Sequence, residues 1–129
     1  MKLNVMFTIA AISLILIAIG TFLATVLPAL GTTNAFGTFG MMIGAVCMLS
    51  LGVIAWLVRN AEASKTRDAL VLGYTLLFAL WAVVSLIGQF GQFSDLSGHK
   101  FSWLIALIQA LIAVGFYTAG KSSMSKSAS

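Results

Sequence analysis

Four long apolar runs that contain no charged side chain dominate this sequence. They cover residues 5–27, 35–58, 69–90 and 101–119. Each run is close to the ~20 residues that a helix needs to cross the hydrocarbon core of a bilayer. A helix suits that environment because it satisfies its backbone polar groups internally. We therefore expect an all-α integral membrane protein, a four-helix transmembrane bundle in one domain (residues 1–120) with a polar tail (residues 121–129).

Composition supports the same class. Of the 129 residues, 60% are hydrophobic and 8% are charged, whereas soluble domains carry about 25% charged residues. A chain this short cannot enclose so much apolar surface in a water-soluble core. The lipid bilayer is thus an expected partner. The net charge of +4 is interpreted as a topology signal, not as a nucleic-acid interface.

The charged residues cluster in one short stretch. "RNAEASKTRD", residues 59–68, holds five of the ten charged residues. Six of the seven Lys and Arg residues fall on one side of the four predicted spans, and Lys100 falls on the other. Because basic loops stay in the cytoplasm, this bias predicts cytoplasmic N and C termini. Asp68 is expected to cap the third helix.

Small residues recur on one side of two predicted helices. The second span carries Gly37, Gly40 and Gly44, and the fourth span carries Ala106, Ala110 and Ala113. Gly-x-x-x-Gly spacing lets two helix backbones approach closely in lipid. We interpret both faces as packing faces. Their contacts are either internal or with another subunit.

Polar side chains form a candidate seam on the third and fourth spans, at Trp81, Ser85, Gln89 and Gln109. Gln109 falls near the middle of its span, where an unsatisfied amide is costly, so we expect it to have a partner on a neighbouring helix. Two interpretations stay open. The seam is either an interhelical hydrogen-bond cluster or a small-molecule or lipid-headgroup pocket.

Residues for catalysis or metal binding are scarce. The predicted spans have no ionisable Asp, Glu, Lys, Arg or His, which proton relays and ion pathways normally use. The single cysteine, Cys47, and the single histidine, His99, do not supply a metal site. We expect no enzyme activity and no cofactor. An alternative is a pigment- or haem-binding subunit that uses His99 as a ligand.

Residues 51–120 are similar to a group of small bacterial four-helix membrane proteins. The similarity lies in "LGVIAWLVRNAEASKTRDALVLGYTLLFALWAVVSLIGQFGQFS" and in the fourth-span ending "ALIAVGFYTAG". This chain departs from the group in "GQFGQFSDLSG", which is shorter there. The resemblance implies a bacterial inner-membrane location. It implies no activity and no binding residues, because the group is functionally uncharacterised.

The sequence as a whole favours a non-enzymatic function. We expect an accessory or structural subunit that packs against itself or against a larger membrane complex, since small-residue faces are present and chemistry-bearing clusters are absent. The alternative that uses the candidate seam is a small homo-oligomeric pore or carrier for neutral or lipid-like molecules.

Overall fold

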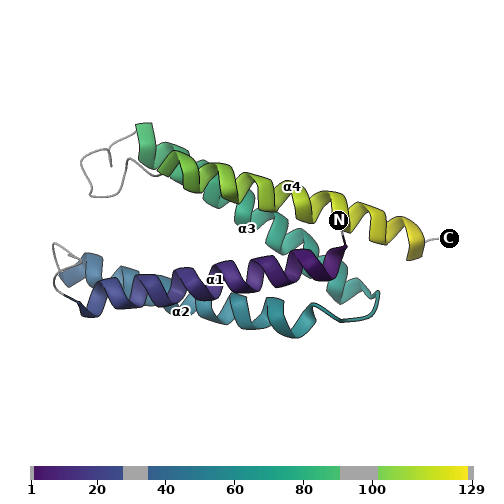
Figure 1. Cartoon of the computed structure of the whole chain (residues 1–129), viewed down its shortest axis with the longest axis horizontal. Helices are drawn as coiled ribbons and strands as arrows, with labels where there is room; N and C mark the ends of the chain where they lie inside the picture. The colour runs from purple at the N-terminus through teal and green to yellow at the C-terminus, as the bar shows by residue number, and fades with distance from the viewer. Residues whose placement is uncertain (1, 28–34, 91–101, 128–129) are drawn as a thin grey trace. The chain divides into compact units, whose positions relative to one another are not determined.

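The computed structural model describes residues 2–27, 35–90 and 102–127, and these are helical apart from Lys2, Leu27 and the short connection after Val58 (Figure 1). The helices are α1 (Leu3–Val26), α2 (Ala35–Val58), α3 (Lys65–Phe90) and α4 (Ser102–Ser127). Each contains a span long and apolar enough to cross a membrane. The shortest helices have 24 residues, or roughly 36 Å at 1.5 Å per residue, against a hydrocarbon core of about 30 Å.

The predicted spans match these helices, with differences at the ends. α2 has the predicted bounds, and α1 begins two residues earlier than expected. α3 begins at Lys65 because Ser64, not Asp68, caps it: the backbone N–H of Arg67 donates to Ser64 Oγ at 3.2 Å. The prediction that Asp68 is the cap was wrong. Asp68 instead lies in the first turn, where its charge favours the helix dipole.

α4 extends further than the sequence predicted. Helix continues through Ser127, into the residues expected to be a polar tail. Ser122 Oγ donates to the backbone carbonyl of Ala119 at 2.9 Å, so that hydroxyl is bonded within the helix. Ser123 has a partner on α3, the side chain of Arg67. These bonds explain how a serine-rich segment stays helical here.

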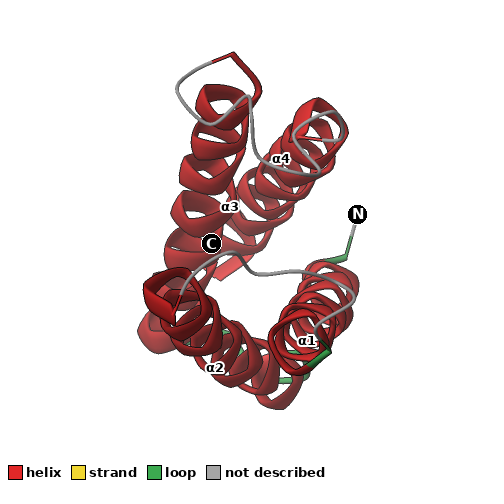
Figure 2. Ribbon diagram, turned by 90° about the vertical axis from the view of Figure 1, so that its left-hand side faces the viewer, coloured by secondary structure: helices red, strands yellow, loops and turns green. Residues whose placement is uncertain are grey.

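The chain divides into two compact units. One comprises residues 62–129 together with residues 1–6, and the other comprises Phe7–Ala61. The first contains α3 and α4 as an antiparallel pair, which the ribbon views in Figures 1 and 2 show side by side. The second contains α2 and nearly all of α1. We refer to them as the α3/α4 pair and the α1/α2 pair.

Aromatic rings fill the contact between α3 and α4. Tyr74 and Phe116 stack with ring centroids 5.6 Å apart, and Phe78 lies 6.1 Å from Phe116. Phe78 also stacks on Trp81 at 6.5 Å, with an angle of 10° between the ring planes. Phe78 and Phe116 are fully buried. Offset ring pairs add about 0.5–1.5 kcal/mol beyond the area that they bury, so this ring cluster is a main source of stability for the pair.

A glycine forms the contact between α1 and α2. A Cβ atom placed on Gly52 would lie 2.8 Å from Ile15 Cγ1, 3.2 Å from Ile15 N and 3.3 Å from Ala11 O. The missing side chain therefore lets α2 reach the backbone of α1. Such close approach maximises the dispersion contacts that hold helices together in lipid.

Large apolar side chains remain on the outside of every helix. The most exposed include Leu16, Leu57, Leu80 and Leu111, each more than 60% exposed. Isolated surface leucines are ordinary, but so many exposed apolar side chains on every helix are costly in water. This surface suits a lipid environment.

Candidate functional site

The candidate polar seam is only partly brought together. Trp81 lies in the ring cluster on α3, and Gln109 on α4 is 2% exposed. Because Tyr74 stacks on Phe116 and the helices are antiparallel, Gln109 lies level with Trp81. Ser85 lies one turn beyond Trp81 on α3 and is half-buried. The side chain of Gln89 lies outside the described residues.

The Oε1 atom of Gln109 lacks the hydrogen-bond partner that the sequence predicted for this side chain. This atom is buried and has no hydrogen-bond partner among the described residues. The facing level of α3 is occupied by Trp81 and Ala82, and no described hydrogen bond joins the Trp81 indole to the amide. Since a buried unsatisfied carbonyl costs about 1–3 kcal/mol, this oxygen is a place where an external donor would gain binding energy.

The small-residue face predicted for α4 coincides only in part with the face of the helix that is buried. Ala106 and Ala113 are buried, as expected of packing residues, but Ala110 is exposed. Gln109, Ile112, Phe116 and Ala119 are buried as well, and the steps of three and four residues follow a helix face. Ala110 is about 100° from Gln109 around the helix and thus misses this face.

Within the α1/α2 pair, the glycine face of α2 is open. Nothing lies within 4 Å of a Cβ atom placed on Gly40 or on Gly44. Cys47, the single cysteine, is also exposed, and it follows at the i+3 position from Gly44 on the same side of the helix. We call Gly40, Gly44 and Cys47 the open glycine face. The surroundings of Gly37 lie outside the described residues.

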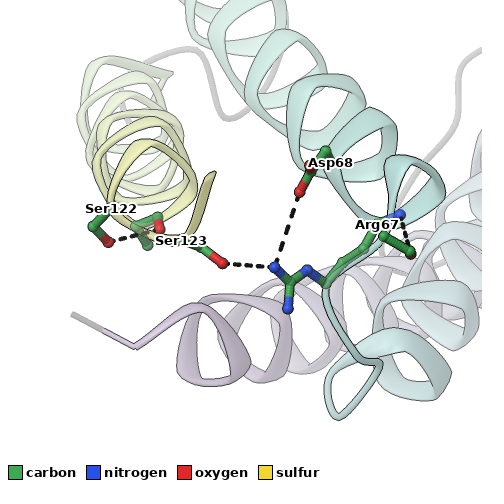
Figure 3. Close-up of polar contacts among 6 residues, drawn as sticks. Arg67, Asp68, Ser122 and Ser123 are labelled. Atoms are coloured by element: carbon green, nitrogen blue, oxygen red, sulfur yellow. Dashed lines mark hydrogen bonds and ion pairs between the residues drawn. The ribbon is translucent and has the colours of Figure 1, made fainter. Parts of the chain in front are cut away.

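A polar cluster joins the first turn of α3 to the end of α4. Arg67 Nη2 donates to Ser123 Oγ at 2.6 Å and lies 3.9 Å from Asp68 Oδ1 (Figure 3). The Arg67 side chain is 13% exposed, which is low for a guanidinium. Sequence reasoning missed this cluster, because it treated Arg67 only as a topology signal. Antiparallel pairing of the third and fourth spans is the signal that places residues 67 and 123 together.

Next to this cluster lies a groove of about 790 Å³ between α3 and α4. We call it the α3/α4 groove. Its residues include Asp68, Leu72, Thr75, Tyr117, Gly120 and Lys121. The helices approach closely beneath it, since a Cβ atom on Gly120 would lie 2.5 Å from Val71 Cγ1. This groove has no signal in the sequence, because its walls come from residues about 50 positions apart.

A second, smaller groove of about 310 Å³ lies between α1 and α2, beside Phe22, Leu23, Ala45 and Leu49. All of its lining residues are apolar, so it offers shape without a group that selects a ligand. In the described ranges, no three His, Cys, Asp or Glu residues come together as a metal-binding group. His99, the candidate pigment or haem ligand, lies outside those ranges.

No family model, curated protein or solved structure matches the chain.

Proposed function

We propose that this chain is a multi-pass membrane protein that acts through association, as a non-enzymatic accessory or structural subunit. The observation that carries the proposal is the open glycine face of α2. Close-approach glycines in a membrane helix favour contact with a second helix, yet nothing lies within 4 Å of a Cβ atom on Gly40 or Gly44. The partner is an apolar transmembrane helix of a second copy or of a larger complex.

The position of Gly52 supports this division of α2 into two faces. Gly52 makes the contact with α1 and lies about a third of a turn around the helix from Gly40. The glycine used inside the α1/α2 pair is therefore different from those of the open glycine face. A second helix can approach Gly40 and Gly44 without displacing α1.

The proposed location is the bacterial inner membrane, with both termini in the cytoplasm. Lys2, Arg59, Lys65, Arg67, Lys121 and Lys126 support this topology, because they all fall on the same side of the four spans. Arg59 also lies over the ring of Trp56, with its guanidinium carbon 3.5 Å from the ring centroid. Such a pair suits the headgroup region at the end of α2.

Cys47 provides a direct test of the association. It is the only cysteine, so any product of thiol cross-linking in membranes must join two different chains. We expect oxidation or a short bismaleimide to yield one discrete product, of doubled mass for a second copy or of another fixed mass for a different subunit. Cys47→Ser should abolish this product.

The variant Gly44→Leu should reduce cross-linking at least several-fold, because its side chain fills the space that the partner helix needs. Gly73→Leu is the matched control: it makes the same substitution at a glycine of α3 that also has nothing within 4 Å. The proposal would be contradicted if native mass spectrometry showed only a single, unassociated chain and if Gly44→Leu left the cross-linking unchanged.

One observation favours a second candidate, a pore or carrier for small neutral molecules. The unpartnered, buried Oε1 of Gln109 is suited to accept a hydrogen bond from such a molecule. Glycerol flux into proteoliposomes tests this function. Flux that collapses in Gln109→Leu and Ser85→Leu, and persists in Ser50→Ala, supports it. Ser50 is a suitable control because its hydroxyl bonds to Val46 of its own helix.

A further inference from the structure

The α3/α4 groove combines an apolar wall with charge at one end. Leu72 and Tyr117 are both more than half exposed along it. The hydroxyl of Thr75 is already used, since it donates to the backbone carbonyl of Val71 at 2.8 Å. The wall is therefore largely apolar and suits a hydrocarbon chain. Its volume of about 790 Å³ lies within the usual range for small-molecule sites.

Asp68 and Lys121 both line the groove, and they carry opposite charges. No ion pair joins them in the described part of the chain; the ionic contact of Asp68 is with Arg67, at 3.9 Å. That distance is beyond a hydrogen bond, so the carboxylate oxygens keep their capacity to accept. The groove thus presents a separate acceptor and a separate cation next to an apolar wall.

Arg67 holds this arrangement in place and leaves Lys121 as the cation of the groove. The Arg67 guanidinium is mostly buried and donates to Ser123. Figure 3 shows it between Asp68 and the end of α4, directed toward both. Because this bond joins α3 to α4, Asp68 and Lys121 lie on the two helices at the same end of the pair.

We propose that the α3/α4 groove binds one zwitterionic phospholipid with a primary amine in its headgroup, of the phosphatidylethanolamine type. The ammonium donates to Asp68, the phosphate lies against Lys121, and an acyl chain follows Leu72 and Tyr117. Opposite charges on the lipid match opposite charges on the protein. The proposal rests on the proposed membrane location, but it is independent of association through α2.

Other phospholipids match less well. A purely anionic headgroup such as phosphatidylglycerol gains Lys121 but meets like charge at Asp68, which acts against it. A phosphatidylcholine headgroup has no N–H group to donate to the carboxylate. Its quaternary ammonium is normally held by a cage of several rings, and Tyr117 is the single aromatic residue among those described as lining the groove.

Native mass spectrometry of the delipidated full-length protein tests this directly. The protein is titrated separately with phosphatidylethanolamine, phosphatidylcholine and phosphatidylglycerol of identical acyl chains. We expect the first phosphatidylethanolamine to bind roughly 5–10-fold more tightly than the other two, the net effect of one typical hydrogen bond. Asp68→Asn should remove most of this preference, and Asp68→Glu should restore it.

Two controls match the charge changes. Glu62→Gln removes the acidic residue of the connection before α3, which is exposed and does not line the groove. Lys65→Gln likewise removes an exposed cation outside the groove. Lys121→Gln should weaken phosphatidylethanolamine and phosphatidylcholine alike, whereas Lys65→Gln should leave both unchanged. Equal affinities for all three lipids, or equal effects of Glu62→Gln and Asp68→Asn, would overturn the proposal.

These experiments distinguish failure of the lipid site from failure of the proposed membrane location and of the proposed association through α2. Recovery of the protein in the soluble fraction of cells would remove the membrane location and the lipid site with it. A membrane-bound protein that cross-links through Cys47 but shows no lipid preference would overturn only the lipid site. If Asp68→Asn does not fold, the response of Lys121→Gln, set against Lys65→Gln, decides the question.

Discussion

The two helix pairs of this protein are held together in opposite ways. α3 and α4 are joined by large rings, with Tyr74, Phe78 and Phe116 stacked between them. α1 and α2 meet where a side chain is missing, at Gly52. Volume stabilises the first pair, and close backbone approach stabilises the second. The α3/α4 pair should therefore be most sensitive to the removal of side-chain atoms, and the α1/α2 pair to their addition.

Loss of a ring should have the largest effect. Phe116 is fully buried and contacts both Tyr74 and Phe78. Phe116→Ala should lower the free energy of unfolding by about 3–5 kcal/mol, because it leaves a cavity as well as losing contacts. Phe116→Leu should cost clearly less. Unfolding of the purified protein in detergent micelles measures both variants. Equal stability of Phe116→Ala and the wild type would show that the rings do not hold the pair.

Addition of one methyl group at Gly52 should come next. The new Cβ would meet Ile15 Cγ1 at 2.8 Å and backbone atoms of α1 at 3.2–3.3 Å. Backbone atoms cannot rotate away, so Gly52→Ala should cost about 2–3 kcal/mol of unfolding free energy. Gly20→Ala is the matched control on the facing helix α1, where the space is open, and it should be neutral or slightly stabilising. Similar losses at both glycines would mean that Gly52 is not a special contact.

A methyl group at Gly120 makes a useful comparison with Gly52, because the atom that it would meet belongs to a side chain and not to the backbone. The added Cβ would lie 2.5 Å from Val71 Cγ1. Gly120→Ala should cost about 1–2 kcal/mol. The double variant Gly120→Ala/Val71→Ala should lose less unfolding free energy than the two single variants together, because Val71→Ala removes the atom that the new methyl group meets. At Gly52, Ile15→Ala should give little rescue. Strict additivity at Gly120 would show that the helices separate without strain.

The sequence predicted the elements better than the contacts between them. Uncharged runs long enough to span a bilayer predicted four helices, and α2 was predicted to the residue. Ser64 was missed as the cap because Asp68 has the stronger capping charge, yet the bond from the Arg67 N–H to Ser64 fixes the start of α3. Helix ends depend on such local competitions between neighbouring side chains.

The predicted site residues show the same limit. Gly40 and Gly52 are both glycines in α2, but one is open and the other touches α1. Periodicity places residues on a helix face, and it does not say which face meets which neighbour. The hydrogen-bond partner predicted for Gln109 is missing at its Oε1 atom for this reason, since α3 presents Trp81 at that level. The α3/α4 groove was missed because Asp68 and Lys121 meet only through antiparallel pairing.

The bond between Arg67 and Ser123 should have the smallest effect, and it tests whether the polar end adds to what the rings supply. Its donor and acceptor are 2.6 Å apart, and the guanidinium is mostly buried. Ser123→Ala and Arg67→Gln should each lower the unfolding free energy by about 1 kcal/mol. A double-mutant cycle should give a coupling of about 1 kcal/mol, because each substitution removes the same bond. Thr118→Ala, on the same helix and bonded to backbone carbonyls within it, should show no coupling to Arg67. Zero coupling with Ser123 would mean that the ring cluster alone fixes the register of α3 against α4.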